Sequence, residues 1–352
     1  MSFLNLEKYL KRCVQDEKIP GWVCWLGTKK QTFFFESYGY AQTYLRRIDI
    51  NKSTLFDLAS LTKPFVTALL IIKLIEEKKL KLTDRLDKFI PEFKKKPIGE
   101  KTIKQILTHT AGIPAWFPLY LIPEEKRFTH LAAMELGGNS VVYSCLGYII
   151  LGKIIEHITG SRLDLYYREA IVKKLSLKNT GFNPKNRRNV AATELGNNYE
   201  KNLASKYGRV TVIKWRNYLI KGEVHDGNSF YAFKGVSGNA GLFSTALEIV
   251  KFIRAYLNGE LISLRGVKSM TCVHTRGKEG RGLGWVVGSY PGIPSSKVFY
   301  HTGFTGTMCC VEPKKELIII LLANAVHPFV KPEIMAPIRR EVVQYAIREY
   351  HG

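Results

Sequence analysis

Two polar side chains at the start of a strongly apolar segment have the types and spacing required for nucleophilic catalysis. Ser60 and Lys63 form the pattern S-x-x-K, which occurs nowhere else in the 352 residues. A serine hydroxyl becomes an effective nucleophile when a neighbouring base takes its proton, and on a helix a lysine three residues further on lies on the same face. If burial lowers the pKa of Lys63, its amine can be that base. The pair therefore predicts acyl transfer through an acyl-serine.

The pair alone leaves a second interpretation open, because one S-x-x-K pattern can arise by chance in a lysine-rich chain. Ser60 would then be an ordinary helix N-cap and Lys63 a solvated side chain. Against this, a lysine in the first turn of an otherwise apolar helix needs a partner or a role.

The element that must hold the pair is the segment 61–79, LTKPFVTALLIIKLIEEKK, which predicts a buried helix. Apolar side chains occupy nearly every face of it. Pro64 is tolerated because the N–H groups of a first helical turn have no helical acceptor. The same unpaired N–H groups, together with the helix dipole, favour negative charge that develops on the Ser60 oxygen.

Strand-like segments occur towards both ends of the chain, and helical segments lie between them. A helix over 145–158 is expected, with Ser144 as its N-cap and Gly160 beyond its end. The other expected elements are a helix over 3–15, a hairpin of strands over 22–27 and 31–39, strands over 282–288, 298–301, 307–312 and 316–323, and a helix over 332–350.

This order of elements predicts an α+β fold, an α/β sandwich. One antiparallel sheet would be assembled from both chain ends and flanked by helices, with an inserted and mainly helical lobe. We expect a single catalytic domain over 1–352, in which residues 1–82 and 201–352 form the sheet-containing lobe and residues 83–200 the helical lobe.

The composition is that of a globular protein with a strong excess of basic residues. Hydrophobic residues make up 45% of the chain, and 53 Lys and Arg against 30 Asp and Glu give a formal net charge of +23. The basic residues are scattered, and their short runs have no interleaved aromatic residues for base stacking. We therefore expect a solvated basic surface without a specific nucleic-acid partner, although the charge can attract anions non-specifically.

Neither the N-terminus nor the apolar stretches predict targeting or membrane insertion. The sequence begins MSFLNLEKYL, without a basic region followed by an apolar one. The longest apolar stretches, such as 65–72 and 317–323, are much shorter than a membrane span of roughly 20 residues. We expect a cytoplasmic protein, and the sequence leaves its oligomeric state open.

The six cysteines predict reduced thiols. They form no C-x-x-C pair, and Cys309 and Cys310 are adjacent, which suits neither a zinc site nor a disulfide framework. No metal or other cofactor is expected.

Five motifs occur in the order in which they are found in class C-type β-lactamases and in the related esterases, D-peptidases and penicillin-binding proteins. The resemblance extends over roughly residues 15–330. The motifs are FDLASLTKPF (56–65), ILTHTAGIP (106–114), Tyr143-Ser144-Cys145 in place of Y-x-N, GEVHDGNSFYAFKGVSGNAGLFST (222–245), and His301-Thr302-Gly303 in place of K-T-G or H-x-G.

The resemblance implies a role for each matching catalytic residue. Ser60 would be the nucleophile, Lys63 its proton acceptor, and Tyr143 the second member of the base pair and the proton donor to the leaving group. The N–H groups of Ser60 and Phe304 would form the oxyanion hole. Without the motif, Tyr143 would be interpreted as a half-buried tyrosine that anchors a loop.

Other residues in these motifs would line the site. His301 and Thr302, followed by Gly303, would form the strand edge that binds an acyl or carboxylate group. We expect His109 to be a structural turn residue. Asp226 and Glu223 would border the cleft without an assigned role.

Two departures from the family pattern bear on the substrate. Cys145 stands where the family usually has Asn, whose amide contacts the amide of the substrate, and His301 stands where β-lactamases usually have Lys. Both argue against β-lactam hydrolysis as the main activity. The resemblance therefore implies an esterase or an amidase/peptidase that acts on a small-molecule ester or amide. The alternatives are a β-lactamase or D-Ala-D-Ala carboxypeptidase, and a catalytically silent binding or scaffold protein.

Overall fold

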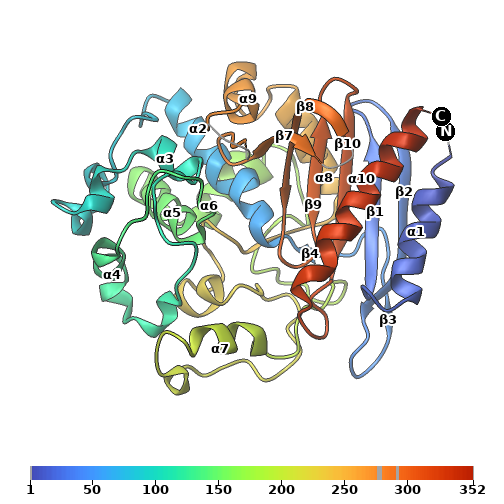
Figure 1. Ribbon diagram of the computed structural model, residues 1–352, viewed down its shortest axis with the longest axis horizontal. Coiled ribbons are helices and arrows are strands. Elements are labelled where there is room, and N and C mark those ends of the chain that lie inside the picture. The colour runs from blue at the N-terminus through green and yellow to red at the C-terminus, as the bar shows by residue number, and fades with distance from the viewer. Residues whose placement is uncertain (1, 276–279, 291–292, 352) are drawn as a thin grey trace.

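The structure is a computed structural model that describes residues 2–275, 280–290 and 293–351 (Figure 1). Its helices are α1 (Leu4–Gln15), α2 (Leu69–Glu76), α3 (Ile103–Leu107), α4 (Arg127–Ala133), α5 (Cys145–Thr159), α6 (Leu163–Tyr167), α7 (Asn198–Ala204), α8 (Ala246–Leu257), α9 (Leu264–Thr271) and α10 (Met335–His351). Its strands are β1 (Gly21–Gly27), β2 (Thr32–Gln42), β3 (Ile48–Asp49), β4 (Phe56–Asp57), β5 (Gly181–Phe182), β6 (Leu242–Ser244), β7 (Val286–Tyr290), β8 (Ile293–Thr302), β9 (Met308–Glu312) and β10 (Leu317–Ala323).

A seven-stranded antiparallel sheet forms the centre of the fold, with the strand order β3-β2-β1-β10-β9-β8-β7. The N-terminal strand β1 pairs with the C-terminal strand β10, so that Trp22 lies opposite Ala323 and Gly27 opposite Ile318. The prediction of one sheet built from both chain ends in an α+β fold is therefore confirmed. β7 begins at Val286, opposite Tyr300, so that His301 and Thr302 at the end of β8 pair with β9 alone.

Helices cover both faces of this sheet (Figure 1). Along β1, Trp22 and Cys24 pack with residues of α1 and α10 on one face, whereas Val23 and Trp25 join the larger core with α2, α5 and α8 on the other. This alternation follows from the two-residue period of a strand. It also separates the adjacent thiols of β9, because Cys309 belongs to the larger core and Cys310 to the other.

The structure corrects the predicted elements at three places. A small sheet of β4, β6 and β5, in the order β4-β6-β5, was not predicted, because two of its strands have only two residues. The strand expected over 282–288 begins only at Val286, since Gly284 has φ +94°, outside the strand region. The helix expected over 61–79 consists of a 3-10 turn, η1 (Ala59–Leu61), a wider π-helical segment, η2 (Lys63–Ala68), and α2.

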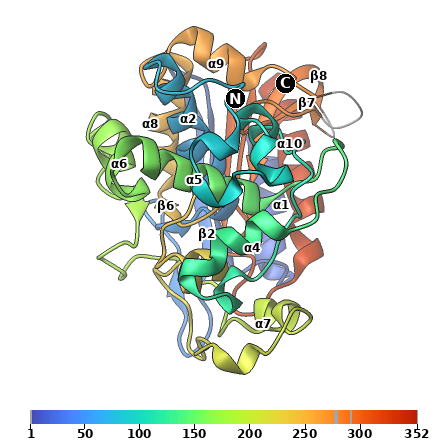
Figure 2. The same cartoon turned by 90° about the vertical axis from the view of Figure 1, so that its left-hand side faces the viewer.

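The helices between the two halves of the sheet face the viewer in Figure 2, where α4, α5 and α6 lie in front. As predicted, the Ser144 side chain caps α5 by accepting the N–H of Gly147, and Gly160 ends the helix with φ +65°. The boundaries of the two lobes stay a prediction. Among the described residues, no helix combines the length and the apolar character needed to cross a bilayer.

Candidate active site

Ser60 lies in a tight turn whose preceding residue has an unusual backbone conformation. Ala59 has φ +47°, in the left-handed region that costs free energy for a residue with a side chain. Two side chains hold it there: Asp57 Oδ1 accepts the Ala59 N–H at 2.8 Å, and Thr62 Oγ1 donates to the Ala59 carbonyl at 2.7 Å. The turn presents Ser60 at the wall of a cavity.

The Lys63 ammonium is fully buried beside Ser60 and has three acceptors. Its Nζ donates to Ser60 Oγ at 3.0 Å, to the Asn239 carbonyl at 3.0 Å, and to Cys145 Sγ at 3.5 Å. These three contacts match the three N–H donors of a charged lysine. The structure thus brings together Ser60 and Lys63, as the sequence predicts.

The expected direction of the Lys63 pKa shift was wrong. Burial does lower the pKa of Lys63, but the negative charges that Cys145, Tyr143 and Asp226 can carry outweigh burial and raise the pKa above its ordinary value. The three acceptors around Nζ indicate an ammonium. Tyr143 and Cys145 act on the pKa of Lys63 as negative charges only once they are deprotonated, because burial raises their own pKa values. This effect could not be predicted from local spacing, because the groups responsible lie 80 or more residues away along the chain.

The N-terminal end of α5 brings two further side chains to the cavity. Tyr143 precedes the helix, with its ring centroid 4.9 Å from Lys63 Nζ, and Cys145 is the first helical residue. Burial raises the pKa of Tyr143, so that its hydroxyl is neutral at neutral pH. His109 fixes this segment, since its Nδ1 accepts the Ser144 N–H at 3.0 Å and its ring packs on Tyr143. His109 has the structural position expected for it.

The C-terminal end of β8 forms the opposite wall. His301, Thr302, Gly303 and Phe304 all line the cavity. A Cβ at Gly303 would lie 2.5 Å from the Leu58 carbonyl oxygen and 2.1 Å from Thr307 Oγ1, so only glycine allows the strand to approach the Ser60 turn this closely.

His301 is a neutral hydrogen-bond acceptor. Burial, together with the charges of Lys63 and Arg281, lowers its pKa to about 3. Its Nδ1 lies 2.9 Å from the Thr302 carbonyl oxygen, which can only accept, so Nδ1 carries the proton. Nε2 is left as an acceptor, buried and without a partner among the described residues. Lysine at this position would instead present a donor with a positive charge.

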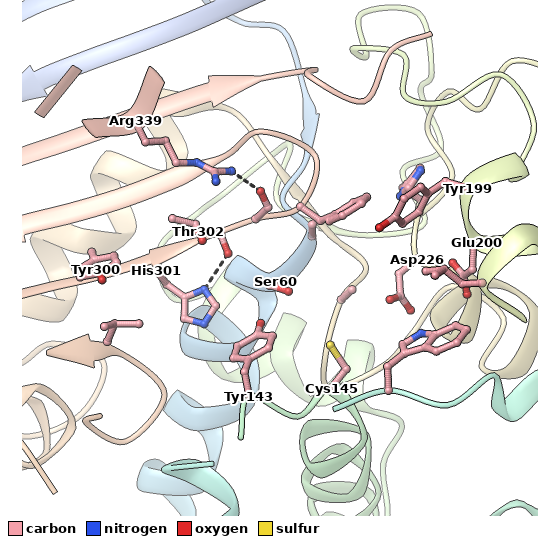
Figure 3. A pocket seen from close by; sticks show the side chains of 18 of the residues that line it. Ser60, Tyr143, Cys145, Tyr199, Glu200, Asp226, Tyr300, His301, Thr302 and Arg339 are labelled. Carbon is pink, nitrogen blue, oxygen red and sulfur yellow. Dashed lines mark hydrogen bonds between the residues drawn. The ribbon is translucent and has the colours of Figure 1, made fainter. Parts of the chain in front are cut away.

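These side chains surround a cavity of about 560 Å³ (Figure 3). Ser60 lies between its two ends: His301 and Arg339 are on one side, and Asp226, Glu200 and Tyr199 on the other. Of the two acidic residues expected at the cleft, Asp226 lines it. Glu223 does not, because its carboxylate pairs with Arg187 and Arg216 at 2.7 and 3.7 Å.

Several lining residues were missed in the sequence. Arg339 donates to the Gly303 carbonyl at 2.5 Å, and burial lowers its pKa to about 10, which leaves it charged at neutral pH. A signal for it exists, because Arg339 interrupts the apolar stripe of α10 formed by Met335, Ile338, Val342 and Ala346. Other missed residues, for which we find no comparable signal, include Trp116, Tyr199, Glu200, His225 and Arg281.

The arrangement contains the groups needed for acyl transfer. A hydroxyl, a lysine and a tyrosine converge at a cavity that Ser60 and Phe304 also line. The roles that the resemblance implies for these residues remain predictions.

The sequence and the fold of this chain are similar to those of several known proteins. A family model described as Beta-lactamase matches residues 6–344. A putative D-alanyl-D-alanine carboxypeptidase of Escherichia coli K12 is 32% identical, and the match covers 86% of this chain and 78% of the relative. N-acetylmuramyl-L-alanine amidase of Bacillus subtilis 168 is 31% identical, over 84% and 75%. The octameric penicillin-binding protein homologue from Pyrococcus abyssi has a similar fold, with a TM-score of 0.75, 24% identity, and coverage of 100% of this chain and 78% of that one.

Proposed function

The chain belongs to the beta-lactamase family and is a serine hydrolase, and from this premise we propose that it cleaves small esters or amides through an acyl intermediate on Ser60. The observation that carries the proposal is the 3.0 Å contact between Lys63 Nζ and Ser60 Oγ, inside a cavity that Tyr143 and the end of β8 also line.

In the proposed mechanism, Lys63 and Tyr143 act as one proton-transfer unit. At neutral pH the unit holds an ammonium and a phenol, so it must lose one proton before it can accept that of Ser60. The Ser60 oxygen then attacks the substrate carbonyl, and the N–H groups of Ser60 and Phe304 stabilise the oxyanion. Tyr143 protonates the leaving group, and water hydrolyses the acyl-serine.

We propose that esters are better substrates than amides. Support comes from Cys145, whose thiol pairs poorly with a substrate amide, and from His301, whose neutral ring does not attract a carboxylate as lysine would. The second candidate is amide cleavage, as in a D-Ala-D-Ala carboxypeptidase, because the two curated relatives are named for carboxypeptidase and amidase activities. The cytoplasmic location and the absence of a nucleic-acid partner remain predictions.

The proposal is tested by labelling the protein with a fluorophosphonate or fluorescent penicillin and locating the modified residue by mass spectrometry. We expect the adduct on Ser60, and burst kinetics with short-chain 4-nitrophenyl esters. Ser60→Ala should abolish both, whereas Ser140→Ala, at an exposed serine, should leave both unchanged. Turnover that persists in Ser60→Ala would show a different nucleophile. A wild type that neither labels nor turns over substrate would favour the catalytically silent alternative.

A further inference from the structure

One end of the cavity carries acidic residues, whereas the protein as a whole is strongly basic. The chain carries a net charge of +23, and Lys63, Arg281 and Arg339 all contact or line the cavity. At the end that holds Tyr199, Glu200 and Asp226, however, two lining residues are acidic, and the aromatic residues Trp116, His225 and Phe304 also line the cavity. We infer that this end binds a positively charged amino or alkylammonium group on the acyl part of the substrate.

Asp226 supplies the charge. Its Oδ1 accepts the Ser229 N–H at 2.8 Å and its backbone carbonyl accepts the Phe230 N–H at 3.0 Å, so the start of the following turn fixes the residue. The carboxylate lies in the cavity between Ser60 and Glu200 (Figure 3). A carboxylate held in place at the wall of a partly closed cavity interacts with a cation more strongly than one in open water.

Glu200 is the second acidic residue that lines this end of the cavity. Its side chain is 7% exposed, and Oε2 accepts the Gly227 N–H at 2.6 Å. Oε1 is buried, and the Tyr120 hydroxyl interacts with the same carboxyl group. Burial and the charge of Asp226 raise the pKa of Glu200 to about 8, so at neutral pH it is mainly a neutral acceptor and donor beside the charged Asp226.

Aromatic rings complete this end of the cavity. The rings of Tyr199 and His225 lie 5.5 and 5.7 Å from that of Phe304, and Trp116 lines the same cavity. Aromatic faces attract alkylammonium groups through their quadrupole, most strongly where water is excluded. A carboxylate beside several rings therefore favours a cation over a neutral group of the same shape.

The assignment to the acyl part rests on the proposed function. If Tyr143 protonates the leaving group, the leaving group lies on the side of Tyr143 and His301. The acyl chain must then extend in the other direction, past Cys145 towards Asp226 (Figure 3). Asp226 also has a simpler possible role, as a distant counter-charge that raises the pKa of Lys63, and the experiment has to separate the two.

The test uses three 4-nitrophenyl esters of matched length: 4-(trimethylammonio)butanoate, its uncharged isostere 5,5-dimethylhexanoate, and the glutarate monoester. Each kcat/KM is divided by the spontaneous hydrolysis rate of the same ester. We expect the wild type to prefer the cationic ester to its isostere by about tenfold, and the anionic ester to be the poorest. Asp226→Asn, which keeps the Oδ1 acceptor for Ser229, should bring the cation-to-isostere ratio close to one. Glu223→Gln, a matched acid outside the cavity, should keep the wild-type ratio.

Two results would overturn the inference. The first is a cation-to-isostere ratio near one in the wild type. The second is an equal loss of kcat/KM for all three esters in Asp226→Asn, which would make Asp226 a counter-charge for Lys63. In either case, fluorophosphonate labelling of Ser60 would show that the proposed function still holds. If Asp226→Asn does not fold, inhibition of the wild type decides. Choline should compete with the cationic ester at least about tenfold better than the uncharged 3,3-dimethylbutan-1-ol, and equal inhibition would contradict the inference.

Discussion

The protonation state of Lys63 decides how the proposed mechanism responds to pH. A neutral lysine could take the Ser60 proton directly, but three acceptors around Nζ and a raised pKa indicate an ammonium. The active form of the enzyme, with one proton fewer, is therefore a minor species at pH 7. The fraction of the enzyme in this active form increases as the pH rises.

We therefore expect kcat/KM for an ester to rise about tenfold per pH unit from pH 6.5 to 9, without a plateau. The sign follows from the raised pKa: deprotonation activates the enzyme, and it occurs above this range. Rates are measured under single-turnover conditions, with Ser60→Ala as the blank for hydroxide hydrolysis. A plateau that begins below pH 8 would mean that Lys63 is not the cation described above.

Cys145 links specificity to the same lysine, because its Sγ lies 3.5 Å from Lys63 Nζ. Asparagine at this position offers an amide to the substrate amide, which removes a pairing deficit of about 1–3 kcal/mol. In Cys145→Asn the ratio of kcat/KM for a matched ester and amide should therefore fall roughly tenfold. The rise of kcat/KM with pH should also begin at a lower pH, because one cause of the raised Lys63 pKa is removed. If neither the ester-to-amide ratio nor the pH dependence changes, Cys145 is a packing residue. Efficient hydrolysis of a chromogenic cephalosporin by the wild type would instead favour the β-lactamase alternative.

At the scale of elements, the site exists because β8 ends against the turn that carries Ser60. Thr307 Oγ1, which follows the strand, donates to the Leu58 carbonyl at 3.0 Å, and Thr305 Oγ1 donates to the Asp57 carbonyl at 2.7 Å. The sequence predicts strands over 298–301 and 307–312, before and after the residues that contact the Ser60 turn. It does not predict the junction itself, because contacts between residues about 250 positions apart leave no periodic pattern.

The junction predicts a specific effect of Gly303→Ala. The added methyl group meets the Leu58 carbonyl and Thr307 Oγ1, so β8 must move away from the Ser60 turn. We expect a loss of about 1–3 kcal/mol in the free energy of unfolding, and a fall in kcat/KM of at least about a hundredfold, since small displacements of catalytic groups are costly. Gly181→Ala, where a Cβ meets nothing within 4 Å, is the control. Full activity in Gly303→Ala would show that the junction does not set the catalytic geometry.

For the whole molecule, the sequence predicts the sheet from both chain ends and the pair Ser60 and Lys63, because short strand-like segments near both ends and local spacing suffice for these. It does not predict the electrostatic balance of the cavity. Asp226, Arg281 and Arg339 belong to segments distant from Ser60 in the chain, and only the folded arrangement makes them neighbours. The direction of the Lys63 pKa shift was wrong for the same reason.

This balance also affects the stability of the whole fold, through Glu200. Its pKa is about 8 in the folded protein against an ordinary value of 4.5, so the folded state binds the proton more tightly than the unfolded chain. The contribution of Glu200 to stability is fully present below pH 4.5 and is lost as the pH rises towards 8, by about 1.4 kcal/mol per pH unit at most. Glu200→Gln removes this dependence, because glutamine stays neutral.

We therefore expect the difference in free energy of unfolding between wild type and Glu200→Gln to shift in favour of the variant by up to about 3 kcal/mol between pH 5 and pH 7.5. The measurement is urea denaturation of both proteins at a series of pH values. Comparing the two proteins cancels the opposite dependence of buried His301 and His109, whose lowered pKa values make the fold less stable at low pH. Glu135→Gln, at an exposed position, should show no such shift. A difference between wild type and Glu200→Gln that stays constant with pH would mean that Glu200 is ionised in the fold, and that the end of the cavity that holds Glu200 and Asp226 carries two negative charges instead of one.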